Sequence, residues 1–448
     1  MDPGADERGG RRRRTVLRGA LAVGAGALAG CSLFGDSEVE TATPASVQPE
    51  ATTPDTAAGT ATRSTTSTRR PPEPTESDAG TPVRTVTAGS VDGWRVAQAD
   101  DGRTGWRPDG VGPVAPVESA WSLDVRGAVG GSVTVADGVA YVGSEAETVT
   151  AVDAENGTEL WTALPDAPVV STPTVARGSV FCGTEAGTLR AYDAVGGREQ
   201  WSFSPDGDRP DSTAIRAGPV VRGGAAYVGA TDGRVYALDV ADGSERWSYD
   251  VGGFLGVVTP VAYAEGRVFA GSYAGRLACV DAGDGSEIWS YAGSGETRAW
   301  SGPTVADGAV YAGGSPDGVV SLDALDGTRR WRVSTDRPVF ASPAVTDGTV
   351  YVGTDAGRVL ALSVADGSER WRRETDGAVK SSPAVVDGRV YVGTTAGSVL
   401  ALDASTGDER WWFAAGAAVT TPIAVVDGRV FVGDEAGDVY ALGTDVGA

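Results

Sequence analysis

The sequence predicts an all-β chain, arranged as a ring of eight four-stranded antiparallel sheets. Three observations predict it. The chain contains 65 Gly among 448 residues, a unit of about 40 residues recurs along most of its length, and one strand-like segment of that unit occurs eight times. Because helix-favouring runs are scarce and turn residues are frequent, short strands joined by tight turns are expected.

The repeating unit is clearest between Ser381 and Trp411, which reads SSPAVVDGRVYVGTTAGSVLALDASTGDERW. Asp-Gly, Ala-Gly and Thr-Gly pairs at 387–388, 396–397 and 406–407 interrupt its apolar alternation, and such pairs are typical of tight turns. Three turns separate four antiparallel strands. A lone sheet of this size leaves both faces uncovered, so its repetition favours blades packed around an axis, a β-propeller.

Two sets of positions give the number of blades. The second strand recurs as YVG, FCG, FAG, YAG or FVG, starting at residues 141, 181, 227, 269, 311, 351, 391 and 431. The units close with Trp121, Trp161, Trp201, Trp247, Trp289, Trp331, Trp371 and Trp411.

The two ends of this repeat are incomplete. The chain ends in VYALGTDVGA without a closing tryptophan, whereas Trp121 in ESAWSLDV has no complete unit before it. We therefore expect residues 119–125 to provide the fourth strand of the eighth blade. This pairing closes the ring and removes two exposed sheet edges.

The end of each unit resembles a known motif. The segment from Ala401 to Trp411, which contains Asp403 and Gly407, resembles the tryptophan-docking motif of the pyrroloquinoline quinone (PQQ) repeat. The resemblance covers residues 119–448, and residues 93–118 resemble the lead-in of such proteins, so 93–448 is the expected propeller domain. It implies that the eight tryptophans pack between adjacent blades. A tryptophan suits that place because it combines a large apolar body with an N–H group that needs a partner.

The PQQ-repeat family contains two functional classes. Dehydrogenases hold PQQ and calcium above the central channel with acidic and amide ligands and long insertions between blades. Other rings, similar to the outer-membrane-assembly lipoprotein, carry no cofactor and bind proteins or serve as scaffolds. This chain has no adjacent cysteines, one Asn in an apparent turn, Asn156, and one clear insertion, residues 204–218. Those features favour the second class, with PQQ and calcium expected only under the alternative of a dehydrogenase or its relict.

Composition excludes several kinds of chemistry. The chain has no His, which removes the commonest general base and all His-ligated metal sites. Cys182 and Cys279 occupy apolar strand positions and are expected to be small core residues. Asp206, Asp208 and Asp211 in the insertion could ligate calcium, but we favour a solvated acidic loop. No catalytic residue and no metal site is therefore predicted.

The N-terminus predicts export. Residues 11–31 read RRRRTVLRGALAVGAGALAGC, a basic stretch followed by an apolar stretch too short to span a bilayer. Within them, 13–18 resembles a twin-arginine signal and 28–31 resembles a lipobox, so residues 1–30 are a predicted signal peptide and Cys31 a predicted lipidation site. A signal cut elsewhere, with Cys31 incidental, is the alternative. These features place the protein at the outer face of the cell membrane, anchored by lipid.

Residues 31–92 are rich in Thr, Pro, Ala and Ser, and they cannot bury enough apolar surface to offset the entropy of ordering. A disordered stalk is expected there.

Comparison of the repeats with one another suggests a binding site. The position three residues before the first-strand Pro varies, in ring order, as Gly130, Val170, Arg216, Val257, Trp300, Phe340, Lys380 and Val419. If the first strands line the channel, two cations and two aromatic side chains surround one mouth: Arg216, Trp300, Phe340 and Lys380. They could form an anion or peptide site, but we slightly prefer the alternative that these side chains plug the channel or pack against the lead-in. We expect a monomer with a protein or peptide partner.

The charge balance predicts a dependence on salt. The chain carries 60 acidic against 37 basic residues, of which only Lys380 is a lysine, and its net charge is −23. Such a surface repels nucleic acid and resembles that of proteins from salt-loving archaea. Because the Debye length falls from about 10 Å at 0.1 M salt to about 3 Å at 1 M, self-repulsion weakens steeply in brine.

We therefore expect the melting temperature of the purified protein to fall on dialysis from molar salt to low salt. Calorimetry across a salt series measures it, and a melting temperature that does not change would contradict the expectation.

Overall fold

The computed structural model describes residues 93–95, 98–205, 213–252, 256–257, 259–294 and 299–444. Strands and turns make up this part of the chain, and no helix in it is long and apolar enough to cross a membrane. The predicted signal peptide at 1–30, the lipidation site Cys31 and the stalk to residue 92 lie outside the described residues. So do Asp206, Asp208 and Asp211.

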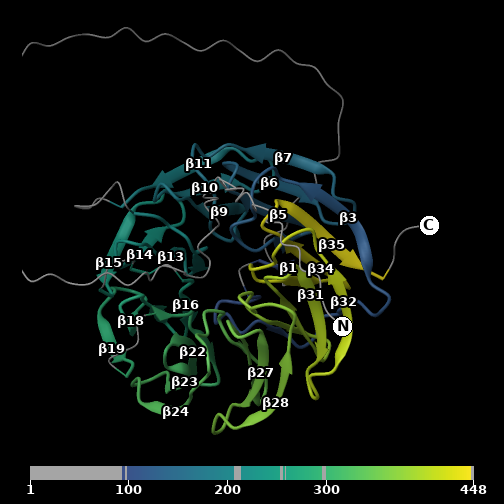
Figure 1. Cartoon of the computed structure of the whole chain (residues 1–448). Helices are drawn as coiled ribbons and strands as arrows, with labels where there is room; N and C mark the ends of the chain where they lie inside the picture. Colours follow the sequence, from purple (N-terminus) through teal and green to yellow (C-terminus); the bar gives the residue numbers. More distant parts are fainter. Residues whose placement is uncertain are drawn as a thin grey trace, which may run out of the picture. The chain divides into compact units, whose positions relative to one another are not determined.

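The described strands form eight sheets around a central axis, each with four antiparallel strands, which confirms the predicted eight-bladed β-propeller (Figure 1). Each blade begins with a short strand next to the axis and ends with a strand at the rim. The second strand of each blade contains one of the eight YVG-like segments. The apolar residues of these segments are buried between neighbouring blades.

The strands of blades one to four follow chain order. Blade one contains β1 (Gly93–Trp94), β4 (Thr134–Ala136), β5 (Val139–Ser144), β6 (Thr148–Asp153) and β7 (Glu159–Ala163). Blade two contains β8 (Thr174–Ala176), β9 (Ser179–Gly183), β10 (Leu189–Asp193) and β11 (Glu199–Phe203). Blade three contains β12 (Val220–Arg222), β13 (Ala225–Gly229), β14 (Arg234–Asp239) and β15 (Glu245–Asp250). Blade four contains β16 (Ala262–Ala264), β17 (Arg267–Gly271), β18 (Arg276–Asp281) and β19 (Glu287–Ala292).

The remaining blades repeat the plan with small additions. Blade five contains β20 (Ala299–Trp300), β21 (Thr304–Ala306), β22 (Ala309–Ser315), β23 (Gly318–Asp323) and β24 (Arg329–Val333). Blade six contains β25 (Ala344–Val345), β26 (Thr349–Thr354), β27 (Arg358–Ser363) and β28 (Glu369–Glu374). Blade seven contains β2 (Trp106–Arg107), β29 (Ala384–Val386), β30 (Arg389–Gly393), β31 (Ser398–Asp403) and β32 (Glu409–Ala414). Blade eight contains β33 (Ala424–Val426), β34 (Arg429–Gly433), β35 (Asp438–Gly443) and β3 (Glu118–Asp124).

Blade eight joins the two ends of the propeller. Strand β3 pairs antiparallel with β35, and Trp121 lies opposite Ala441 in this pairing. Figure 1 shows the blue β3 beside the yellow β35. The sequence placed the closing strand at 119–125, and the structure places it one residue earlier at both ends. The ring is therefore closed by hydrogen bonds between segments more than 300 residues apart.

The closing tryptophans link each blade to the next. In seven of them Nε1 donates a hydrogen bond to a turn carbonyl of the following blade over 2.8 to 3.1 Å, the acceptors being Ala154, Ala194, Val240, Ala282, Ala324, Val364 and Ala404. Each tryptophan also packs against the Tyr or Phe of the second strand of its own blade, with ring centroids 5.7 to 6.0 Å apart. These contacts cover the apolar faces that a lone blade would expose.

Glycine is required where the tryptophan meets the next turn. A Cβ atom added at Gly157, which has a φ of +74°, would lie 2.8 Å from the ring of Trp121. The same close approach recurs at Gly197 against Trp161. The Gly of each unit therefore serves both the left-handed backbone and the docking of the preceding tryptophan.

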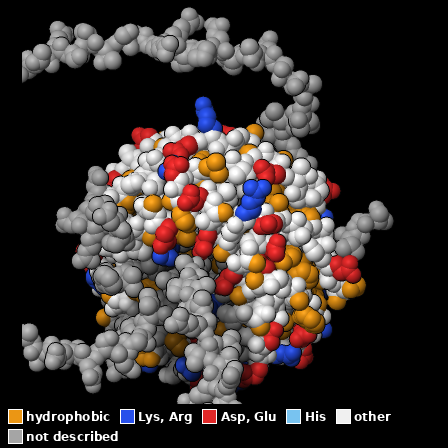
Figure 2. Space-filling model, turned by 45° about the horizontal axis from the view of Figure 1, so that its top comes forward, with side chains coloured by type: hydrophobic (Ala, Val, Ile, Leu, Met, Phe, Trp, Pro, Cys, Tyr) orange, Lys and Arg blue, Asp and Glu red, His pale blue; other side chains and the backbone are white. Residues whose placement is uncertain are grey.

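The eighth docking contact is different. Trp411 Nε1 donates to the carbonyl of Pro113 over 3.2 Å, so the lead-in provides the acceptor that the turn between the third and fourth strands provides in the other seven blades. Cys182 and Cys279, as predicted, are buried free thiols in the core between blades. Figure 2 shows carboxylate side chains dispersed over the visible face, among fewer cationic ones.

We expect removal of residues 112–126 to destabilise the protein far more than removal of residues 33–87. The first deletion removes β3, Trp121 and the acceptor of Trp411. Truncating one packed tryptophan alone costs about 3–5 kcal/mol. Chemical denaturation of both variants measures the difference, and equal losses would contradict the closure.

Candidate functional site

The lead-in lies along the axis of the propeller. Strand β1 pairs with β4 of blade one, and β2 runs parallel to β29 of blade seven. Between them, lead-in carbonyls accept hydrogen bonds of 2.7 to 2.9 Å from the innermost strands of five blades. The donor and acceptor pairs are Val175 and Arg95, Tyr263 and Asp101, Val305 and Gly102, Val345 and Thr104, and Val385 and Gly105. The lead-in thus satisfies inner strand edges that would otherwise face an open channel.

Arg103 is the anchor of this segment. Its side chain is fully buried, and it donates from Nε to the carbonyl of Val261 over 2.5 Å and from Nη2 to that of Gly218 over 2.9 Å. Burial lowers the pKa of Arg103 to about 10, against the opposing charges of Asp101 and Asp100. The guanidinium therefore stays charged at neutral pH and ties the lead-in to blades three and four.

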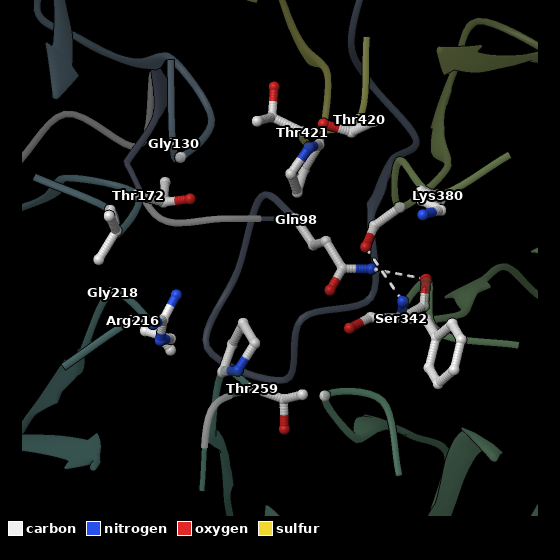
Figure 3. A pocket seen from close by; sticks show the side chains of 18 of the residues that line it. Gln98, Gly130, Thr172, Arg216, Gly218, Thr259, Ser342, Lys380, Thr420 and Thr421 are labelled. Atoms are coloured by element: carbon white, nitrogen blue, oxygen red, sulfur yellow. Dashed lines mark hydrogen bonds between the residues drawn. The ribbon is translucent and has the colours of Figure 1, made fainter. Parts of the chain in front are cut away.

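A pocket of about 140 Å³ lies over the lead-in, where the innermost strands begin. All eight blades contribute to its wall, and Gln98 of the lead-in lies in it (Figure 3). The wall consists mainly of small and hydroxyl residues: Gly130, Gly131, Thr172, Ala217, Gly218, Thr259, Gly302, Ser342, Ser382, Thr420 and Thr421. Neighbouring blades are joined around it by side-chain hydrogen bonds, such as Thr134 Oγ1 to the carbonyl of Pro173 over 2.6 Å.

The structure brings together the four side chains that the repeat comparison singled out. Arg216, Trp300, Phe340 and Lys380 all line this one pocket. Phe340 and Lys380 are half-buried. Trp300 is only 1% exposed and packs against Tyr291 with ring centroids 6.1 Å apart, so it belongs as much to the core between blades four and five as to the pocket.

Two members of the predicted ring are out of register. Val257 and Val419 are fully buried and pack against Gly229 and Gly393, the place taken by Val379 in blade seven. The prediction counted back from the first-strand Pro, but in blades four and eight this Pro stands one position earlier in the strand. Strand β33 begins 40 residues after β29, so the residue of blade eight that corresponds to Lys380 is Thr420. Thr420 lines the pocket in the structure.

Acidic residues on the turns between second and third strands contact the pocket wall, although none of them lines the pocket. Arg216 forms an ion pair with Glu185, and Thr420 donates to Glu435 over 3.1 Å. Burial raises the pKa of Glu145, and the charges of Glu185 and Glu435 raise it further. Carboxylates of blades eight, one and two therefore share one side of the mouth.

On the opposite side, a carboxylate also lies near a cation of the pocket wall. Burial raises the pKa of Asp355, against the opposing charges of Lys380 and Arg337. Both cations of the pocket wall thus have a carboxylate nearby, and the anion or peptide site from the sequence stays a prediction. Among the described residues, no group of three or more Cys, Asp or Glu could hold a metal ion.

Gln98 was missed by the sequence reasoning. Its side chain is 1% exposed, and its Nε2 donates to the carbonyls of Ser342 and Pro343 over 3.3 and 3.0 Å. Because Gln98 belongs to the lead-in, it has no counterpart in the repeat, and comparison of the blades cannot find it.

Comparison of the sequence with models of known families identifies a family with this architecture. A model described as the outer membrane protein assembly factor BamB matches residues 89–255, 254–379 and 376–448. The chain belongs to this PQQ-repeat family. A comparison with curated proteins finds no match.

Solved structures share the fold of the family. BamB from Moraxella catarrhalis is 17% identical, with a TM-score of 0.62 over 73% of this chain and 99% of the other. The computationally designed Ika8 protein is 20% identical, with a TM-score of 0.63 over 72% and 99%. The quinohemoprotein alcohol dehydrogenase from Comamonas testosteroni is 16% identical, with a TM-score of 0.69 over 79% and 81%. Structures from both functional classes thus resemble the propeller, so the fold alone does not choose between them.

We expect Arg103→Met to destabilise the protein by about 3–6 kcal/mol, because two hydrogen bonds from a charged group are lost at about 1.5–3 kcal/mol each. Arg222→Met is the matched control: Arg222 forms an exposed ion pair with Asp101, and such pairs contribute about 0–1 kcal/mol. Urea denaturation compares the variants, and equal effects would show that Arg103 does not anchor the lead-in.

Proposed function

We propose that this protein is a non-catalytic binding module, exported and held by lipid at the outer face of the cell membrane, which binds a protein or peptide at the pocket over the lead-in. The observation that carries the proposal is the pocket itself. Its wall comes from all eight blades and its floor is filled by the chain's own lead-in. A concave site of mixed polarity with a few aromatic side chains suits one inserted side chain or loop.

The alternative of a PQQ-dependent dehydrogenase fits this pocket poorly. PQQ is a planar quinone with three carboxyl groups, and it needs cations around it. The two cations of the wall, Arg216 and Lys380, already lie near Glu185 and Asp355. Glu145 and Glu435 add negative charge at the mouth. A trianionic ligand would therefore meet like charge on several sides.

Export and anchoring rest on the N-terminal sequence. The twin-arginine-like segment 13–18 and the lipobox-like segment 28–31 support a signal peptide followed by lipidated Cys31. The family description, an outer membrane protein assembly factor, supports a protein partner outside the cytoplasm. The acidic composition supports a salt-rich environment. We propose a monomer, because closure by β3 and β35 leaves the sheets of the ring complete within one chain.

Photo-cross-linking from the pocket tests the binding function. With p-benzoylphenylalanine in place of Phe340 in the full chain, expressed in its own cells, we expect one protein to be captured on irradiation. The control places the same group at Leu164, which is 72% exposed and directly follows the rim strand β7. The adduct should form from position 340 and not from position 164.

Titration with PQQ and calcium tests the alternative. We expect no oxidation of alcohols or sugars with an artificial electron acceptor. Turnover in this assay, or the absence of a protein adduct from position 340, would overturn the proposed function.

A further inference from the structure

Asn156, the only asparagine of the chain, lies in the turn that joins β6 to β7 in blade one. With Gly157 and Thr158 it forms the sequence Asn-Gly-Thr, which matches the Asn-x-Ser/Thr sequon of N-linked glycosylation. A short sequon also arises by chance, so its value depends on what the turn itself requires of these residues.

The same turn in the other blades shows what the fold requires. Between the third and fourth strands, four blades have an aspartate where blade one has Asn156: Asp242, Asp284, Asp326 and Asp366. Each carboxylate accepts the backbone N–H of the Ser or Thr two residues later over 2.9 to 3.0 Å. Three of them also accept the hydroxyl of that residue over 2.7 Å. The turn therefore requires an acceptor at this position, and a carboxylate provides it twice.

An asparagine serves this turn less well than an aspartate. Asn156 Oδ1 accepts the N–H of Thr158 over 2.9 Å, but the Thr158 hydroxyl does not donate to it. In blade three, by contrast, hydrogen bonds from Ser244 lower the pKa of Asp242, so the turn favours the ionised side chain. In a chain with 60 acidic residues and one asparagine, the needs of the turn do not account for the choice of Asn156.

The groups that glycosylation uses are exposed and make no contact that the fold needs. Asn156 and Thr158 are both exposed. Because Oδ1 is held by the Thr158 N–H, the amide Nδ2 points away from that bond. Within the described part of the chain, neither Nδ2 nor the Thr158 hydroxyl makes a hydrogen bond. An enzyme can therefore engage both groups on the folded protein, which suits the folded export that the twin-arginine-like segment predicts.

The turn lies at the end of blade one that is remote from the pocket. The pocket lies where the innermost strands begin, and successive strands of a blade alternate in direction, so the third strand ends at the opposite side. The turn is also held in place: Gly157 N donates to the carbonyl of Asp153 over 2.8 Å, and Arg429 of blade eight donates to that of Ala154 over 3.0 Å. A glycan attached there extends into solvent and leaves the pocket open.

We propose that Asn156 carries an N-linked glycan, which is added outside the cytoplasm. The inference goes beyond the proposed binding function and rests on the proposed export. In the reaction, Asn156 Nδ2 forms a bond to the anomeric carbon of an oligosaccharide carried on a lipid phosphate. The bond from this carbon to the phosphate oxygen breaks, the lipid phosphate leaves with the bonding electrons, and one amide proton passes to a base of the transferase.

Mass spectrometry of the full chain, recovered from the outside of its own cells, tests the inference. Trypsin cleaves after Arg126 and Arg177, and residues 127–176 contain no Lys or Arg, so a single peptide reports on Asn156. We expect most of this peptide to carry a sugar mass on Asn156. A peptide that is unmodified, or only deamidated at Asn156-Gly157, would overturn the inference.

Variants that keep the turn show whether the sequon directs the sugar. Asn156→Asp introduces the residue of the sister turns, and Thr158→Ala keeps the backbone N–H that holds Oδ1. Both remove the sequon, so both should lose the sugar and still fold, as circular dichroism can check. Thr158→Ser is the matched control, because it keeps the sequon and should keep the sugar. A sugar that persists in Thr158→Ala would contradict the site.

The outcome is distinct from that of the proposed function. If the exported protein carries no sugar while position 340 captures a partner, the binding module stands and only the glycan is wrong. If the chain is recovered only from the cytoplasm, the proposed export fails, and the glycan fails with it.

Discussion

The hydrogen bond from each tryptophan to a turn of the next blade is the contact on which the rest of the propeller depends. It spans 2.8 to 3.1 Å in seven cases and joins the rim strand of one sheet to the following sheet. A four-stranded blade alone leaves both faces exposed, so each blade is stable only against its neighbours. Because the same contact recurs at seven of the eight junctions, neighbouring blades pack in the same way around the axis, and the starts of their innermost strands line one central pocket.

The lead-in provides hydrogen-bond acceptors that the repeat lacks at two places, the rim of the ring and its axis. At the rim it provides the Pro113 carbonyl to Trp411, because no turn joins the third and fourth strands of blade eight. At the axis it provides carbonyls to innermost strands and the buried guanidinium of Arg103 to blades three and four. One stretch of chain without repeat character therefore satisfies polar groups that a perfect repeat cannot satisfy by itself. The same stretch determines how deep the pocket is.

Much of this architecture could be predicted from the sequence, because the same strand, turn and tryptophan segments recur in each repeat. The period, the turn residues and the unpaired Trp121 give the blades and their closure without any structure. The pocket wall was harder. Proline at 260 and 422 stands one position from its place in the other blades, and a count from proline therefore placed Val257 and Val419 at the channel. Gln98 could not be predicted, since its position depends on the path of a segment without a repeat.

Salt bears on how such a pocket can select its ligand. At about 1 M salt the Debye length is about 3 Å, so the charges spread over the outside of the ring contribute little attraction. Only groups in direct contact, or those shielded from solvent inside the pocket, retain their effect. An acidic exterior can then keep the protein soluble without deciding what it binds. Under the proposed function, selection falls to the polar and aromatic side chains that line the pocket, because these act over the length of a hydrogen bond.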